Sequence, residues 1–581
     1  MTFDLLIRGG TVVDGLGGEP FVGDVAVRDG VICEVGVVGS SQGTGAREID
    51  ATGLLVTPGF VDLHTHYDGQ AIWSDRLTPS SAHGVTTAVM GNCGVGFAPC
   101  RAADHEVLVD VMAGVEDIPG VVMVDGLPWH WETFPEFLDA VAAGTRDIDV
   151  AAFLPHSPLR VYVMGQRGVD REPATAEDLA MMRKLAAEAV HAGALGFASS
   201  RFTLHKTESG KPIPSFDADR AEIEAIARGV DDAGGGLIQF VPDLVAGDYE
   251  PVLQTVFDVA AEVGLPVTFT LAIGNAGDPF FLDALTMVEK ANRNTGTDGP
   301  MITAQIFPRP IGLVLGLELS GNPFVMYPSY REIAALPLAE RVAEMRKPEV
   351  RQRILADKPE SDGHPLMFAA QAWNYMFPLG DPPNYEPSPS DSVGARAQAR
   401  GVSPLEEAYD RLLDEDGHAM LLVTLANFRD GSLDTVADLI RRDDVVLGLG
   451  DGGAHYGMIC DASFPTYMLT HWVRDRPSGR LTVAEAVREL TSTPARVAGL
   501  ADRGRIAVGY KADLNVIDAE ALRLHKPVVV GDLPAGGRRL DQTADGYVAT
   551  IVAGEVIAEN GVPTAARPGT LIRGRRPAPA V

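Results

Sequence analysis

The stretch "GFVDLHTHYDGQ", residues 59–70, closes an apolar run and places two histidines one residue apart, His64 and His66. Successive side chains of a strand point to opposite faces, so these two imidazoles share one face. Two imidazoles that converge at the end of a strand form half of a site for zinc or a similar metal. The pattern is also common by chance, and a polar strand end that faces water would read the same way. The rest of the chain has to decide between the two interpretations.

Eight short apolar runs, rich in β-branched residues, recur along the middle of the chain. They cover residues 54–63, 85–91, 149–154, 194–199, 237–241, 266–271, 301–307 and 444–449. Helical stretches such as 176–192 and 217–231 lie between several of them. This alternation is typical of a parallel (β/α)8 TIM barrel, so we predict an α/β fold of that kind. Residues 320–420, rich in Pro, Tyr and Trp, break the rhythm and predict an insertion that either covers the barrel mouth or is a plain surface excursion.

The two ends of the chain differ from the middle and look alike. Both read as short strands separated by Gly and Asp-Gly turns, which is a hairpin pattern. We therefore predict one small β-sandwich built from residues 1–53 and 503–581, beside a barrel spanning 54–502. The last ~15 residues, rich in Pro and Arg, are expected to fray.

Composition excludes several classes of protein. The net charge of the 581 residues is −31, without a long basic patch, which argues against nucleic acid and anionic membrane surfaces as partners. No apolar run approaches the ~18 residues of a membrane span, and we expect no signal peptide. Four cysteines make no disulfide framework, so a reducing, cytoplasmic location is predicted. We also expect a small-molecule substrate and a homo-oligomer.

Chemically capable side chains fall at the ends of the predicted strands, where barrel enzymes carry their catalytic residues. They are Cys93, His156, Arg201, His205, Arg309, Asp451 and His455. A carboxylate opposite a histidine pair can bind a metal and accept a proton from water. Taken singly, each has an ordinary structural interpretation: Cys93 could be a buried filler and Asp451 a turn residue. Their joint placement favours a site.

Seven segments add a further signal: "DLLIRGGTVVDG", "PGFVDLHTHYD", "GNCG", "HSPLRVYVMG", "GALGFASS", "GDGGAH" and "GRIAVGYKADLNVID". Through them the chain resembles the amidohydrolase superfamily, and within it the D-aminoacylase type. The resemblance implies a metal-dependent hydrolase that cleaves the amide bond of an N-acyl amino acid or related N-acyl compound with metal-activated water. It also implies that His64, His66 and Asp451 bind metal, and that Cys93 matches the cysteine that ligates zinc in D-aminoacylases.

Two histidines of the family pattern are missing. They would follow strands 5 and 6, which here read "LIQFVPD" and "PVTFTLAIG". His364 is the one histidine between His205 and His418 and falls in the insertion, while Asp243 is a weak substitute after strand 5. A bridging modified lysine is not expected, because strand 4 contains none. We therefore predict one zinc per chain rather than two, with other divalent metals left open.

The remaining roles follow from position. Asp451 is expected to move the proton to the leaving nitrogen, and His156 or His205 to donate to the oxyanion. The basic side chains that hold the substrate carboxylate in D-aminoacylases have no counterpart in "TFTLAIG" or "MICDASFPTY". Candidate replacements by position alone are Arg160, Arg201, Lys206 and Arg309. Two alternatives stay open: hydrolysis of a cyclic amide or imide at the same site, and a non-catalytic small-molecule-binding barrel with a degenerate metal site.

Overall fold

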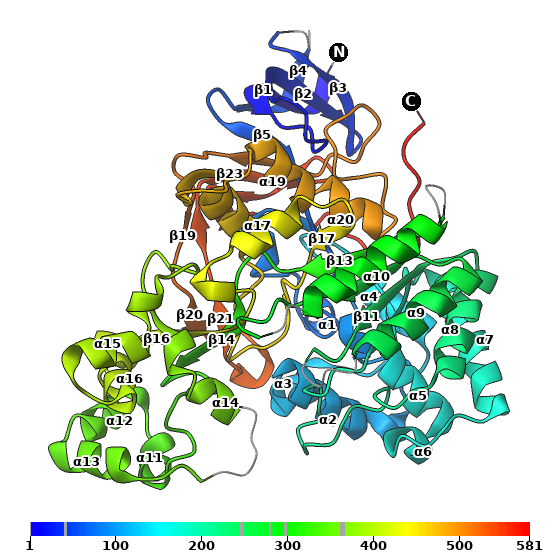
Figure 1. Ribbon diagram of the computed structural model, residues 1–581. Helices are drawn as coiled ribbons and strands as arrows, with labels where there is room; N and C mark the ends of the chain where they lie inside the picture. The colour runs from blue at the N-terminus through cyan, green and yellow to red at the C-terminus, as the bar shows by residue number, and fades with distance from the viewer. Residues whose placement is uncertain are drawn as a thin grey trace.

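The computed structural model describes residues 2–39, 43–244, 249–277, 280–295, 299–360 and 366–580 (Figure 1). His364, named above as the histidine of the insertion, lies outside these residues. The fold is α/β, with parallel sheets at its centre, an antiparallel sheet at one end and a separate lobe of short helices.

Two parallel sheets hold the central strands. The first contains β6 (Phe60–Asp62), β7 (Val85–Met90) and β8 (Asp149–Ala152); the second runs in the order β17 (Val445–Leu447), β13 (Ile302–Ile306), β12 (Val267–Thr270), β11 (Leu237–Val241), β10 (Gly196–Ser200) and β9 (Leu154–Pro155). Only Phe153 separates β8 from β9, and its N–H donates to the carbonyl of Met90 at 2.9 Å. At the other side, the N–H of Asp451, after β17, donates to the carbonyl of His64, after β6, at 3.1 Å.

Helices cover the outer face of the second sheet. They are α7 (Ala176–Ala192), α8 (Arg220–Asp232), α9 (Tyr249–Val263) and α10 (Phe280–Thr295), and Figure 1 shows them side by side. A capping box of Thr175 and Asp178 begins α7, since each side chain accepts a hydrogen bond from the backbone of the other residue. The apolar face of α8, including Ile223 and Ile226, is buried. No helix in the described part of the chain has the length and apolar character needed to cross a membrane.

The first predicted strand, 54–63, is divided between two sheets. β5 (Leu55–Pro58) belongs to the antiparallel sheet and β6 to the parallel one, with Gly59 between them. A Cβ on Gly59 would lie 2.2 Å from Oγ1 of Thr86, so only glycine fits where the chain passes from one sheet to the other. Nothing in the sequence pattern marks this break, because the residues on both sides of Gly59 are apolar and buried.

A nine-stranded sheet joins both ends of the chain. Its order is β25 (Val562–Pro563), β24 (Glu555–Glu559), β23 (Tyr547–Val552), β18 (Leu514–Ile517), β5, β1 (Thr2–Val12), β2 (Phe21–Arg28) and β3 (Val31–Val37), while β4 (Thr44–Asp50) pairs with β1. The two ends have the same hairpin pattern because their strands belong to the same sheet. The last residues do not fray as expected: Leu571 and Ile572 are buried, and the N–H of Ile572 donates to the carbonyl of Val150 at 2.7 Å.

The insertion is a lobe with its own core. β14 (Ile311–Gly316), β16 (Met420–Ala426) and β15 (Met376–Leu379) form an antiparallel sheet in which β16 is central. The helices α11 (Pro328–Ala334), α12 (Leu338–Met345), α13 (Pro348–Ala356), α15 (Val393–Arg400) and α16 (Pro404–Leu412) accompany it (Figure 1). Phe324, Tyr330 and Tyr409 belong to a buried apolar cluster separate from that of the parallel sheets.

Candidate metal centre

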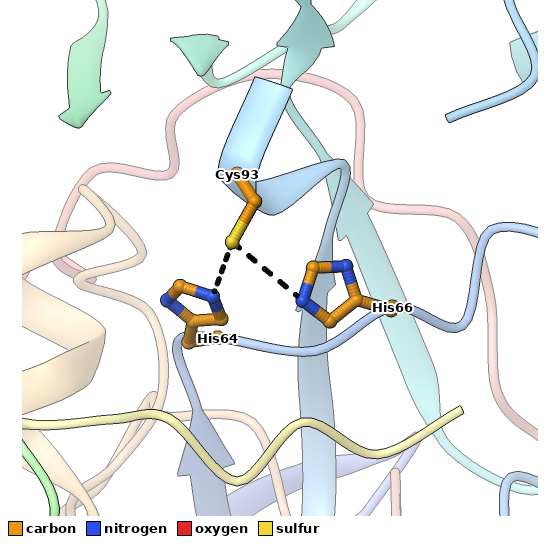
Figure 2. A group of neighbouring side chains, drawn as sticks. All are labelled: His64, His66 and Cys93. Carbon is orange, nitrogen blue, oxygen red and sulfur yellow. Dashed lines mark hydrogen bonds between the residues drawn. The ribbon is translucent and has the colours of Figure 1, made fainter. Parts of the chain in front are cut away.

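Three potential ligands meet where β6 and β7 end. His64 and His66 follow β6, and Cys93 lies in the short turn η2 (Asn92–Gly94) after β7. Figure 2 shows both imidazoles turned toward the thiol. The Cys93 Sγ lies 3.3 Å from Nε2 of His64 and 3.9 Å from Nε2 of His66. The three ligand atoms lie within 4.8 Å of one another, and all three residues are buried.

Asp451 supplies a fourth group. Its Oδ1 lies 3.6 Å from the Nε2 atoms of both His64 and His66. In a tetrahedral zinc site with ordinary Zn–N, Zn–O and Zn–S lengths, ligand atoms are separated by about 3.3–3.6 Å. The distances from His64 Nε2 to the thiol and from both imidazoles to Asp451 fall in this range, and the distance from His66 Nε2 to the thiol is longer, at 3.9 Å. The two imidazoles together with the thiol form a potential metal-binding group, and Asp451 lies beside both rings.

Side chains from the second sheet hold the ligands in place. Cys93 adopts a left-handed backbone conformation, φ 57°, which is uncommon for a residue other than glycine. Its N–H donates to Oε1 of Gln239, on β11, at 3.0 Å. Nδ1 of His64 lies 2.8 Å from Oε1 of Gln305, on β13. With its Nδ1 proton donated to that amide, the His64 ring presents the lone pair of Nε2 to the centre.

The electrostatics of the centre favour a bound cation. Burial lowers the pKa of His64 to about 4 and that of His66 to about 3, so both rings are neutral near pH 7. Burial also raises the pKa of Asp68 to about 7, and it raises the pKa of Glu116 and of the Cys93 thiol well above their usual ranges. Neutral imidazoles surrounded by buried acids are stabilised when a cation takes up the negative charge.

His205 lies on the loop after β10, near enough to His66, His455 and His64 for their charges to affect its pKa. The Oγ of Ser200 accepts the N–H of Phe202 at 3.1 Å, so the hydroxyl proton is free to donate to Nδ1 of His205 at 2.8 Å. The proton of a neutral His205 ring then sits on Nε2. Burial, together with the neighbouring His66 and His455, lowers the pKa of His205 to about 3. The ring is therefore a neutral hydrogen-bond donor beside the ligands.

His156 and Arg160, predicted for catalysis and substrate binding, lie in a different network. His156 Nδ1 is 2.8 Å from Oγ of Ser199, and its Nε2 is 2.8 Å from Oε1 of Glu222, on α8. Arg160 Nε is 3.3 Å from the same carboxylate oxygen. Ser199 and Ser200 are consecutive on β10 and point to opposite faces, so His156 is held on the helix side and His205 on the other face. The structure does not bring His156 and Arg160 to the metal ligands.

Replacing His156 by alanine is expected to reduce stability without changing metal content. The change leaves the buried hydroxyl of Ser199 and the carboxylate of Glu222 without the ring, which costs about 1–3 kcal/mol of unfolding free energy. Chemical denaturation and metal analysis of the same preparation check this. If His156→Ala has normal stability but loses its metal, His156 takes part in metal binding and the prediction is wrong.

Arg309 is also occupied within the protein. Its Nη2 lies 2.5 Å from Oδ1 of Asp461 and 3.0 Å from the carbonyl of Cys460, and its Nη1 donates to Oγ of Ser463 at 3.0 Å. The guanidinium also stacks on Tyr385, 3.9 Å from the ring centre. The predicted role of Arg309 as a clamp for a substrate carboxylate therefore loses its support, because Asp461 already neutralises the charge.

Several residues of the centre were not identified from the sequence. They are Asp68, Glu116, Gln239 and Gln305. Gln239 and Gln305 are polar residues within apolar strand runs, and this is a signal that could have identified them. Glu116 lies at the end of helix α2 (His105–Glu116), where nothing in the local pattern distinguishes it.

Comparison with known proteins agrees with this geometry. The family model described as "Amidohydrolase family" matches residues 47–558. An uncharacterized protein of Mycobacterium tuberculosis is 28% identical over 97% of this chain and 92% of its own length. The N-acyl-D-glutamate deacylase of Alcaligenes xylosoxydans xylosoxydans is 27% identical over 89% of this chain and 88% of its own.

The fold also matches solved structures. A structure of D-aminoacylase, titled for the role of its binuclear metal centre, superposes with a TM-score of 0.64 at 23% identity, covering 99% of this chain and all of that one. The N-acyl-D-glutamate deacylase from Bordetella bronchiseptica, complexed with zinc and a phosphonate inhibitor, gives 0.63 at 22% identity with the same coverage.

The family model and the deacylase relatives, together with a parallel α/β core that carries two buried histidines and a buried thiol, indicate a hydrolase of carbon–nitrogen bonds other than peptide bonds. The chain belongs to the amidohydrolase family, and it is similar to its D-aminoacylase members.

Proposed function

We propose that this protein is a zinc-dependent deacylase that hydrolyses the amide bond of an N-acyl amino acid or a related small N-acyl compound, with one zinc per chain. The spacing of the His64, His66, Cys93 and Asp451 ligand atoms carries the proposal. The stretches "LIQFVPD" and "PVTFTLAIG", which contain β11 and β12, hold no histidine, and this supports one zinc rather than two. A non-catalytic binding barrel would not need the two histidines, the thiol and the carboxylate together.

The proposed architecture is a closed (β/α)8 barrel flanked by a β-sandwich. The hydrogen bonds from Phe153 to Met90 and from Asp451 to His64 support closure, since they join the two parallel sheets at both sides. The proposed division assigns residues 1–53 and 503–581 to the sandwich and 54–502 to the barrel, with the insertion at about 320–420. The shared nine-stranded sheet supports this division, with Gly59 as the point of passage.

The chain's own groups divide the chemistry between them. Zinc, when bound, would activate water and polarise the scissile carbonyl. The Asp451 carboxylate lies beside both imidazoles, where it can accept the proton of the attacking water and deliver it to the leaving nitrogen. The Nε2–H of His205 donates to the oxygen of the scissile carbonyl as negative charge develops. Burial of the ligands keeps bulk water away from the reacting bond.

The charges near the centre favour a neutral group over a free carboxylate on the substrate. Arg309 is paired with Asp461, and Arg160 is paired with Glu222. Arg201 remains as a candidate: burial lowers its pKa, and the charges of Asp217, Asp219 and Glu222 oppose that shift. A carboxylate buried without a cation carries a desolvation cost of several kcal/mol.

Small N-acyl amino acid amides are therefore expected to be hydrolysed faster than the corresponding free acids. Comparison of kcat/KM for N-acetyl-D-amino acids with their amides and esters measures this preference. If the free acids are instead hydrolysed far faster, and Arg201→Ala abolishes the difference, Arg201 binds the substrate carboxylate. Absence of hydrolysis across the whole set by protein loaded with zinc would refute the deacylase.

A further inference from the structure

The burial of the Glu116 side chain is energetically unfavourable. Its side chain is 1% exposed, and both carboxylate oxygens lack a hydrogen-bond donor among the described residues. It also ends α2, and the C-terminal end of a helix carries partial negative charge that disfavours a carboxylate. Burial, missing hydrogen bonds and the helix end all oppose an anion here, so the fold alone gives no reason for a glutamate.

The surroundings of Glu116 supply that reason. Its Oε1 lies 3.3 Å from Nδ1 of His66, and its Oε2 lies 3.4 Å from Nε2 of His455. Both contacts are within ion-pair distance but do not have hydrogen-bond geometry, so Nδ1 of His66 and both carboxyl oxygens are polar atoms that face one another without a bond. The Nε2 of His66 faces Cys93 and Asp451, so Glu116 sits behind the ring, on the side away from the other ligands.

The same residue also contacts the loop that follows β17. The backbone N–H of His455 donates to the carbonyl of Glu116. The next residue of the helix end, Asp117, accepts the N–H of Gly457 at 3.1 Å and the hydroxyl of Ser320. The end of α2 thus fixes the loop that begins at Asp451, but only Glu116 reaches both that loop and a metal ligand.

We propose that Glu116 is the positioning residue of the metal centre: it holds the proton of His66 on Nδ1, keeps Nε2 available as the ligand, and ties this ring to the loop that carries Asp451. Gln305 does the same for His64 through a neutral amide. Glu116 offers a carboxyl oxygen at the corresponding place behind His66. The inference rests on the proposed zinc site, toward which both rings are turned.

Zinc affinity of the metal-free chain tests the proposal directly. Competition with a chromogenic chelator is measured for the unaltered protein, Glu116→Gln, Glu116→Asp and the control Asp117→Asn. We expect Glu116→Gln to bind zinc roughly 10–100-fold more weakly, the usual effect of losing a group that orients a ligand. Glu116→Asp, which keeps the charge but is one methylene shorter, should fall between. Asp117→Asn, on the same helix end but without contact to a ligand, should bind as the unaltered protein does.

Two further readouts separate positioning from folding and from ligation. The melting temperature of metal-free Glu116→Gln should be unchanged or higher, because the variant keeps the size of the side chain and removes a buried acid whose oxygens have no hydrogen bond among the described residues. The cobalt-substituted variant should keep the thiolate charge-transfer band of the unaltered protein, since Cys93 and the imidazoles remain the ligands. Equal zinc affinity in Glu116→Gln and the unaltered protein, an equal loss in Asp117→Asn, or an altered cobalt spectrum would each overturn the proposal. An unaltered chain that binds no zinc would instead refute the zinc site itself.

Discussion

The double variant His64→Ala, His66→Ala is expected to contain almost no zinc and to lose amide hydrolysis. The two rings provide two of the four proposed ligands, and the thiol of Cys93 is buried among acids that oppose its ionisation. Without the imidazoles, the remaining thiol and carboxylate are too few ligands to hold zinc. Metal analysis of purified protein, at matched concentration, measures the effect.

A suitable control for this pair is His418→Ala. His418 is largely exposed and lies 2.6 Å from Glu318, in the insertion lobe. Its removal deletes a histidine without touching the centre, so zinc content and activity should stay unchanged. Zinc retained by the double variant would mean that metal binds elsewhere, and that the strand-end histidines are not its ligands.

Replacing Asp451 by asparagine is expected to lower kcat by roughly 10²–10⁴-fold, the usual contribution of a general acid–base group. The amide keeps the size of the carboxylate but accepts no proton in the reaction. Because Asn, like Asp, tolerates the left-handed backbone found here at φ 48°, the melting temperature should change little. Steady-state kinetics on a substrate from the amide series measures the loss.

Asp430→Asn provides the matched control for this variant. Asp430 also has a left-handed backbone, φ 56°, and its side chain is 89% exposed, away from the centre. It should therefore leave kcat unchanged. Near-normal turnover by Asp451→Asn would show that Asp451 has no role in proton transfer and is only a turn residue.

The periodic features of the sequence predicted the fold well, because they depend on local chemistry. Alternation of buried strands and amphipathic helices placed the parallel strands to within two residues at most ends, and the hairpin texture at both ends corresponds to one sheet. The histidine pair is likewise local, since strand parity alone brings His64 and His66 to one face. Gly59 is the exception, because a break between two buried strands leaves no change in hydrophobicity.

The alternation of side chains along β10 separates the two histidines that were predicted to bind the oxyanion. His156 and His205 both follow strands, yet neighbours on β10 hold one ring on the helix side and the other on the opposite face. The exact residue at which a strand ends fixes this choice, and sequence patterns give strand ends only to within a few residues.

The ion-pair partners of the buried charged residues were harder to predict from the sequence than the strand ends. Arg309 is paired with Asp461, 152 residues away, and Glu116 reaches His455 from a helix after strand 2. No periodicity encodes such contacts, because they arise only when the loops above the strands pack against one another. The buried tail at Leu571 and Ile572 was missed for the same reason.

The metal content of the unaltered protein tests the central claim most directly. Protein purified without chelator and dialysed against metal-free buffer should retain close to one zinc per chain, bound by His64, His66, Cys93 and Asp451. Two tightly held equivalents would contradict the single-metal centre and require ligands on β11 and β12. Protein that retains no zinc, and takes up none when zinc is supplied, would contradict the account as a whole.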